Sequence, residues 1–348
     1  MTERLQDVFG IDEPIVLGPF GGLSSVELTT SVSELGGLGS YGLYGYTRER
    51  IHDTIAQLRA ATDKPFAVNL WLPTGDEVIP SDVDLEPSLA ALSPLFEAAG
   101  VAAPTPLAAF LPFIQDQLDA VLEAAPAVLS VVFGVPDAAL VDAARGRGIR
   151  IIGTATTVAE ARALDKAEVD AIVATGAEAA GHRVSWLRPA EDSLVGTFAL
   201  VPQVVDAVGV PVIAAGGIAD RRGVAAAFAL GASGVQVGTA FLRTRQSAAT
   251  DAHRAAIARA SDTDTVLTRA MSGRLARGIP NRTMRTIETA GIIAPFPAQN
   301  WLTGVFRAAA ARSGDGDLLS LWAGQASALA VRDDAAEVFA ELAAGVPR

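Results

Sequence analysis

The stretch Ala171-Ile-Val-Ala-Thr-Gly-Ala-Glu-Ala-Ala-Gly-His182 changes character halfway along its length. Its first four residues are apolar, as in a buried parallel strand, whose hydrophobic side chains form a continuous run instead of alternating with polar ones. The small residues that follow break this run and lead to His182, one of three histidines in the chain. We interpret this stretch as a strand that ends in a loop and brings a proton-active side chain to a ligand cavity.

Two stretches further along the chain change in the same way. Val210-Pro-Val-Ile-Ala-Ala-Gly-Gly-Ile-Ala-Asp220 precedes a helix-like segment, and Gly231-Ala-Ser-Gly-Val-Gln-Val-Gly-Thr-Ala-Phe241 follows it. Each glycine cluster comes directly after an apolar, β-branched run, where a parallel strand would end. Taken alone, these glycines could equally end helices and form turns. At strand ends they would let backbone N–H groups approach a ligand such as a phosphate.

Short apolar runs alternate with helix-period segments about eight times along the chain. The predicted strands are 15–17, 38–40, 66–70, 128–133, 149–153, 171–174, 212–215 and 234–237. Eight such units form either a closed barrel or a doubly wound open sheet, and the periodicity does not separate the two. The number of units favours the barrel.

Several of the intervening helices have recognisable signals. Ile51, Ile55 and Leu58 recur on one face of a segment that begins after Thr47, as in a surface helix. Thr157 and Glu160 have the spacing of a capping box, in which each side chain accepts a hydrogen bond from a free backbone N–H. Asp220 is a candidate N-cap for the helix that precedes Gly231.

Two regions do not fit the repeat. Residues 73–118 are rich in Pro, Asp and Glu and look like an insertion after the third strand, and the strand-helix alternation stops near Arg243. The predicted fold is therefore an α/β TIM (β/α)8 barrel over 1–244, with an insertion at 73–118 after strand 3 and a C-terminal helical extension over 245–348. We expect the extension to pack near the active-site face and, together with the insertion, to form the pocket walls.

Composition excludes several classes of protein. A formal net charge of -12 argues against a surface that binds nucleic acid or anionic membranes, both of which need clustered Lys and Arg. The absence of cysteine excludes disulfides, thiolate metal sites and cysteine nucleophiles, and we expect no metal site. The first residues lack the apolar core of a signal peptide, and no apolar run is long enough for a membrane span. We expect a cytoplasmic enzyme, and the sequence leaves a homo-oligomer open.

With these motifs in place, the chain resembles the nitronate monooxygenases, formerly called 2-nitropropane dioxygenases, which are FMN-dependent TIM barrels. The likeness is carried by Pro14-Ile-Val-Leu-Gly-Pro-Phe20, Gly36-Gly-Leu-Gly39, Pro65-Phe-Ala-Val-Asn-Leu70, the stretch ending at His182 and both glycine clusters. Gly273-Arg-Leu-Ala-Arg-Gly278 and Leu321-Trp-Ala-Gly-Gln325 in the extension are also similar to this family.

The resemblance implies a set of FMN contacts. Asn69 matches an asparagine that contacts the flavin, Gly18 to Phe20 would lie beside the isoalloxazine ring, and both glycine clusters would hold the phosphate. His182 matches a histidine near the reactive edge of the flavin and is the expected catalytic residue. The expected cofactor-binding residues are Gly18, Pro19, Phe20, Asn69, Thr175, Ala180, Gly181, Gly216, Gly217, Gln236, Val237, Gly238 and Thr239.

The chain also departs from the family pattern. Thr175 stands where the family usually has Gln, Ala180 replaces the first glycine of a Gly-Gly pair, and Phe20 replaces a methionine. After the histidine, the chain runs Arg183-Val-Ser-Trp-Leu-Arg188 where many members have a glycine-rich turn. These departures affect the prediction of the substrate more than that of the cofactor.

Other candidate residues receive simpler interpretations. We expect His52 and His253 to be solvated on polar helices. Arg183 and Arg188 either meet an anionic substrate or lie on a solvated loop. Trp186, Trp301 and Trp322 are interpreted as packing residues, with Trp301 also a candidate for the pocket wall.

Three functions are compatible with the sequence. The first is oxidation of alkyl nitronates, and also of nitroalkanes, by dioxygen to a carbonyl compound and nitrite, with His182 as acid or base. The second is an FMN-dependent NAD(P)H reductase that acts on quinones or enoyl thioesters. The third is a barrel that binds flavin or phosphate without catalysis. The physiological substrate, the use of NAD(P)H and the oligomeric state are not determined by the sequence.

Overall fold

The computed structural model describes residues 4–105 and 108–348. Two short segments lie outside the described residues. They are residues 1–3, which begin the segment without a signal-peptide pattern, and residues 106 and 107 of the predicted insertion. In the part that the structure describes, no helix is both long and apolar enough to cross a membrane.

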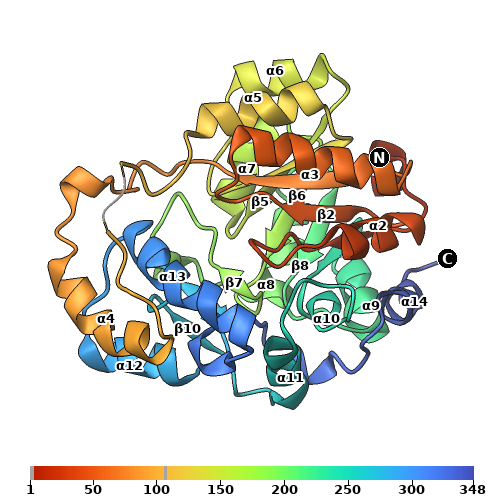
Figure 1. Cartoon of the computed structure of the whole chain (residues 1–348). Helices are drawn as coiled ribbons and strands as arrows, with labels where there is room; N and C mark the ends of the chain where they lie inside the picture. Colours follow the sequence, from red (N-terminus) through yellow and green to blue (C-terminus); the bar gives the residue numbers. More distant parts are fainter. Residues whose placement is uncertain (1–3, 106–107) are drawn as a thin grey trace.

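Eight parallel strands surround a common axis in this protein (Figure 1). They are β1 (Ile15–Leu17), β2 (Gly39–Gly42), β3 (Phe66–Trp71), β4 (Val128–Val132), β5 (Arg150–Ala155), β6 (Ala171–Thr175), β8 (Val212–Ala215) and β9 (Gly234–Val237). Hydrogen bonds link them in the order β1-β9-β8-β6-β5-β4-β3-β2. A parallel bridge between Val16 and Leu38 joins the two ends of this sheet. The sheet is therefore a closed barrel, as predicted, and not an open sheet.

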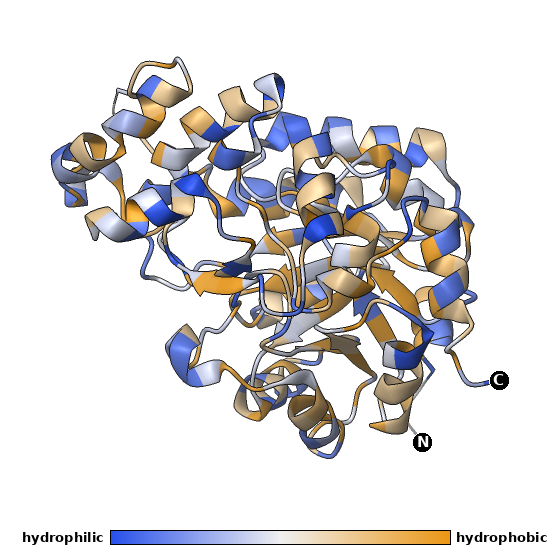
Figure 2. Cartoon of the chain, turned by 90° about the horizontal axis from the view of Figure 1, so that it is seen from below, coloured by the Kyte–Doolittle hydropathy of each residue, from blue (hydrophilic) through white to orange (hydrophobic). Residues whose placement is uncertain are grey.

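Helices between the strands cover the outside of the barrel. They are α2 (Val26–Glu34), α3 (Arg48–Ala61), α5 (Ile114–Ala124), α6 (Ala138–Arg145), α7 (Val158–Lys166), α8 (Thr197–Val205) and α9 (Arg221–Ala229). The short α10 (Thr239–Leu242) follows β9, and α1 (Leu5–Phe9) precedes β1 and shares a separate core with strand residues such as Val16 and Val173. Figure 2 shows mainly apolar strands at the centre, surrounded by helices in which hydrophilic and hydrophobic residues are mixed. Burial of β-branched strand residues against the helices drives this arrangement, because apolar area removed from water is the main favourable term in folding.

The helix signals read from the sequence are confirmed with one change. Thr47 and Asp220 accept hydrogen bonds from first-turn N–H groups of α3 and α9. Thr157 caps α7 by accepting a bond from Glu160 N. The Glu160 carboxylate, however, accepts bonds from Thr156 N and from Trp186 N instead of returning to Thr157. Glu160 is thereby fully buried and anchors the loop that follows His182.

A second lobe lies beside the barrel (Figure 1). It contains α4 (Glu86–Ala98) from the insertion and α12 (Arg282–Ala290) and α13 (Ala298–Ser313) from the extension, which share a separate hydrophobic core. The extension also includes α11 (Asp251–Arg259) and α14 (Ala335–Ala343). Single 3-10 turns occur at Pro80–Asp82, Ala190–Ser193, Gly316–Leu318 and Ser327–Leu329.

The extension differs from the predicted helical segment in two ways. It contains two strands, β10 (Val266–Thr268) and β11 (Ala276–Gly278), which pair with each other. The other edge of β11 pairs with β7 (Gly181–His182), so the three strands form a small antiparallel sheet. Its last helix, α14, packs against α2, α9 and β1 on the outside of the barrel instead of near the active-site face. The division of the chain at residue 244 remains a prediction.

Candidate active site

A cavity of about 430 Å³ opens at the carboxyl ends of the barrel strands. The strand register explains why segments distant in sequence meet there. Leu17 of β1 pairs with Val237 of β9, and Ala215 of β8 pairs with Gln236 of β9. The residues that follow these strands therefore lie side by side. They are Gly18, Pro19 and Phe20 after β1, Gly216 and Gly217 after β8, and Gly238 and Thr239 after β9.

The glycine clusters present free backbone donors to this cavity. Gly216 and Gly217 have φ values of 101° and 73°, which favour glycine because a Cβ is strained in this conformation. Among the described residues, no protein group accepts a hydrogen bond from the N–H of Gly217 or of Gly238. Backbone N–H groups need a partner when they are removed from water. These two are therefore available to an anionic ligand.

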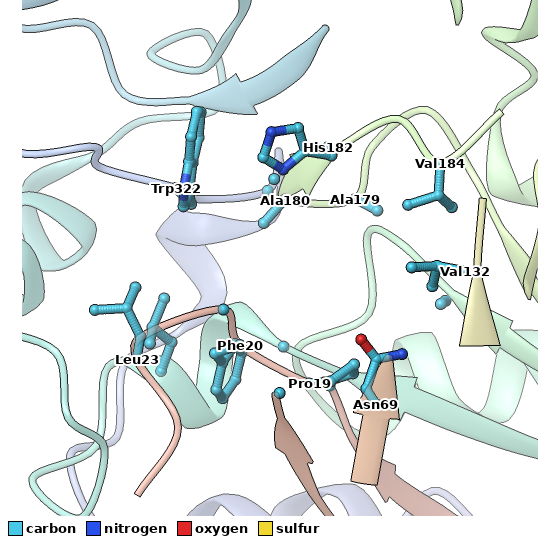
Figure 3. Close-up of a pocket in the computed structure, with 18 of the residues that line it drawn as sticks. Pro19, Phe20, Leu23, Asn69, Val132, Ala179, Ala180, His182, Val184 and Trp322 are labelled. Atoms are coloured by element: carbon cyan, nitrogen blue, oxygen red, sulfur yellow. The ribbon is translucent and has the colours of Figure 1, made fainter. Parts of the chain in front are cut away.

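The cavity has two facing walls (Figure 3). Pro19, Phe20 and Asn69 lie on one side, and His182 and Trp322 lie on the other, with open space between them. Asn69 Nδ2 donates to the main-chain oxygen and to Oγ of Ser130, both at 3.2 Å. The Asn69 oxygen is left directed toward the space, where it can accept a hydrogen bond (Figure 3).

His182 lies in an apolar and electropositive part of the cavity wall. Its ring is 4.9 Å from the Trp71 ring and 5.5 Å from the Trp322 ring, between centroids. Burial lowers the pKa of His182 to about 3, with smaller contributions from the positive charges of Arg274 and Arg307. The imidazole is therefore neutral near pH 7, and it can accept a proton but cannot supply positive charge.

The pairing of β7 with β11 fixes the position of this histidine. His182 is opposite Ala276 in the antiparallel register, and its Nε2 lies 2.8 Å from Ser272 Oγ. Ser272 Oγ is also 3.1 Å from the Arg274 carbonyl oxygen, to which it donates. With the hydroxyl proton directed to this carbonyl, Nε2 of His182 donates to Ser272, and the lone pair of the ring is on Nδ1.

Thirteen of the fourteen residues expected from the sequence line the cavity: Gly18, Pro19, Phe20, Asn69, Thr175, Ala180, Gly181, His182, Gly216, Gly217, Gln236, Gly238 and Thr239. Val237 differs, because its side chain is buried in the main core and its carbonyl accepts a bond from Gly18 N. Their contacts with a cofactor remain predictions.

Several lining residues were missed by the sequence analysis. Tyr44 and Trp71 come from the ends of β2 and β3, and Asn300 and Arg307 come from α13. Aromatic residues at strand ends and polar residues on a helix have no spacing that distinguishes them from packing or surface residues. Trp322 also lines the cavity, although it was interpreted as a packing residue.

Other expectations were wrong. His253 is buried, not solvated, because its Nε2 donates to the Trp322 carbonyl oxygen at 3.0 Å. Trp301 packs against Phe110 and does not line the cavity. No described residue of the 73–118 insertion lines it either.

The contacts and exposure of Arg183 and Arg188 show that neither side chain meets a ligand in the cavity. Arg183 is buried and donates to the carbonyl oxygens of Thr175, Gly176 and Ser193, so it holds the loop together. Arg188 is exposed. Neither residue lines the cavity.

Glu178, in the stretch before His182, supports the loop in a similar way. Its carboxylate accepts hydrogen bonds from N and Oγ1 of Thr197, at the first residue of α8. A Cβ on Gly176 would lie 2.0 Å from the same Thr197 Oγ1. The small residues of this stretch therefore allow the loop to pack closely against α8.

Comparisons with known proteins agree with this geometry. The chain is 40% identical over 346 residues to a probable nitronate monooxygenase of Staphylococcus aureus (strain JH9), covering 97% of this chain and 96% of the relative. The structure is similar to that of nitroalkane oxidase from Streptomyces ansochromogenes, with a TM-score of 0.88, 35% identity, and coverage of 98% and 96% of the two chains. It is also similar to FabK from Thermotoga maritima, with a TM-score of 0.75, 28% identity, and coverage of 98% and 95%. The family model described as nitronate monooxygenase matches residues 2–345, and the chain therefore belongs to the nitronate monooxygenase family of flavin-dependent oxidoreductases.

Proposed function

We propose that this protein uses FMN and dioxygen to oxidise alkyl nitronates, and the parent nitroalkanes, to a carbonyl compound and nitrite. The observation that carries the proposal is that one cavity holds free backbone donors, two facing walls and a neutral histidine, in a chain of the nitronate monooxygenase family. The substrate partners are then a small nitronate and dioxygen.

The residues present fit FMN. The N–H groups of Gly217 and Gly238 would bind the phosphate, and the space between Phe20 and His182 would take the flat ring system. The free oxygen of Asn69 would accept a hydrogen bond from a ring N–H. Thr175 and Gln236 line the same cavity and offer further polar groups. When bound, FMN supplies the electron transfer to and from the substrate and dioxygen.

His182 would act as the base toward a neutral nitroalkane. The proton on the carbon next to the nitro group is acidic, and the unprotonated Nδ1 of His182 would accept it. The rings of Trp71 and Trp322 pack beside His182, and the low-polarity surroundings keep the imidazole neutral. For a nitronate that is already an anion, no proton needs to be removed, and His182 would position the substrate by hydrogen bonding.

The test is an anaerobic mixing experiment with purified protein loaded with FMN. We expect a nitronate to bleach the flavin absorbance without NADH or NADPH, and air to restore it with release of nitrite. Bleaching by NADH or NADPH, with no nitrite from any nitronate, would indicate the reductase instead. Protein that does not bind added FMN would refute both functions.

His182→Asn tests the proposed role of the histidine. This variant should retain FMN, because the change leaves the backbone donors in place. Turnover of a nitroalkane should fall by about 10²- to 10⁴-fold, the usual contribution of a positioned base. Unchanged turnover would show that another group removes the proton.

A further inference from the structure

Arg307 is a partly buried cation in the cavity wall without a carboxylate partner among the described residues. It lies on α13, in the lobe beside the barrel. Its Nη2 donates to the main-chain oxygen and Oδ1 of Asn300, at 2.9 and 2.7 Å. Its Nε is buried and has no hydrogen-bond partner in the part of the chain that the structure describes. Part of the guanidinium group therefore has unused hydrogen-bonding capacity.

The nearby acidic groups do not neutralise this charge. Burial raises the pKa of Tyr44, so the phenol on the same wall stays neutral. The carboxylate of Glu178, which also lines the cavity, is bound by Thr197. Burial lowers the pKa of Arg307 to about 10, so the guanidinium still carries its charge near pH 7.

Arg274 provides a contrast within the same protein. It is buried near His182, and it donates to Glu77 Oε1 at 2.7 Å and is paired with Asp76 as well. A buried charge is costly unless it is paired. The pairing of Arg274 is complete within the protein, whereas that of Arg307 is not. Arg183 also lacks a carboxylate partner among the described residues, but it lies outside the cavity, whereas Arg307 lines it, so the missing partner of Arg307 is expected to come from a ligand.

An anionic substrate needs this charge for two reasons. The chain has a formal net charge of -12, so its overall field does not attract an anion. His182 is neutral and contributes no positive charge. A short-range donor with a fixed positive charge in the cavity wall can hold an oxyanion. Arg50 also lines the cavity, but it is exposed and its guanidinium lies over the Tyr46 ring, which leaves Arg307 as the less solvated cation.

We propose that Arg307 binds the anionic nitronate group of the substrate and makes the enzyme select nitronate anions over neutral nitroalkanes. This inference rests on the proposed function for the identity of the substrate. The binding of a planar oxyanion next to Arg307 does not depend on turnover and can be tested separately.

The test compares Arg307→Met with Arg312→Met in the FMN-loaded protein. Arg312 is exposed on the same helix, so its replacement controls for loss of charge and helix propensity. Nitrate serves as an unreactive planar oxyanion, and its dissociation constant is measured by calorimetry. We expect Arg307→Met to weaken nitrate binding about ten- to a hundredfold, the usual effect of losing a hydrogen bond to a charged group, and Arg312→Met to leave it unchanged.

Kinetics give a second measurement. Arg307→Met should raise KM for an alkyl nitronate by a similar factor and leave KM for the parent nitroalkane nearly unchanged. Equal changes for both substrates, or wild-type affinity for nitrate, would overturn the proposal. If no nitronate yields nitrite in any of these proteins, the proposed function fails, while the nitrate titration still decides the role of Arg307.

Asn300→Asp tests the same charge if the Arg307→Met protein does not fold. This nearly isosteric change places a carboxylate where Asn300 Oδ1 now accepts from Arg307 at 2.7 Å, and it should cancel the charge. We expect a loss of nitrate affinity at least as large as in Arg307→Met. Unchanged affinity in Asn300→Asp would also overturn the proposal.

Discussion

Nε2 of His182 lies 2.8 Å from Ser272 Oγ, while aromatic rings of Trp71 and Trp322 cover the imidazole. No described carboxylate pairs with this ring, so nothing offsets the cost of protonating it in a buried site. The ring is thus unprotonated near neutral pH and free to accept a proton, although burial makes it a weaker base than free histidine, and it does not hold an anion by charge. We assign the second task to Arg307. In this cavity His182 would accept the proton and Arg307 would bind the anion, two roles that a single histidine could otherwise fill in its neutral and protonated forms.

This assignment predicts the pH dependence of turnover. Burial lowers the pKa of His182 to about 3, so the base remains unprotonated well below its usual range. For a neutral nitroalkane, kcat/KM should therefore not fall as the pH is lowered from 8 to 5. Initial rates of nitrite release measure this, with flavin absorbance at each pH as a control for retained FMN. A decrease centred near pH 6.5 would show that His182 is solvated in the working enzyme.

At the scale of elements, the strand ends were the part of the site that the sequence predicted best. Gly18, Asn69, Thr175, Gly217 and Gly238 follow apolar runs, and parallel strands of a closed barrel bring such positions to one face. The pairing of β7 with β11 was not predictable in this way. A two-residue strand has no periodicity, and its partner is almost a hundred residues away.

The glycine conformation at the end of β8 leads to a prediction about FMN. Gly217 has φ of 73° and a free N–H, whereas Gly314, which ends α13, has φ of 75° and no neighbour near its missing Cβ. Alanine at either position costs roughly 1 kcal/mol of unfolding free energy, because L residues disfavour this conformation. Gly217→Ala should also shift the N–H and raise the FMN dissociation constant by about tenfold. Fluorescence titration with FMN measures the difference, and equal affinity in the two variants would exclude a phosphate contact at Gly217.

At the scale of the whole molecule, the lobe beside the barrel was only partly predictable. The end of the strand-helix alternation marked where the extension begins, but α4 and α13 are separated by almost two hundred residues and share one core. Such contacts between distant segments depend on which apolar faces fit together, and the hydrophobic pattern of each helix does not contain that information. For the same reason, Asn300 and Arg307 were missed, although α13 supplies them to the cavity.

The dependence of the unfolding free energy on pH should depend on the contact between α11 of the extension and Trp322 in the cavity wall. His253 on α11 donates to the carbonyl oxygen of Trp322, and burial lowers the pKa of this histidine to about 4. In the unfolded chain the pKa is about 6.5, so between these values the unfolded state binds more protons and the unfolding free energy falls as the pH falls. His253 alone should reduce the unfolding free energy by roughly 1 kcal/mol between pH 7.5 and 5.5. His253→Gln keeps a neutral donor without the titration, so urea unfolding at the two pH values, at one FMN concentration, should show a smaller difference in this variant. The same difference in both proteins would mean that His253 is accessible to water and that the contact between α11 and Trp322 opens in solution.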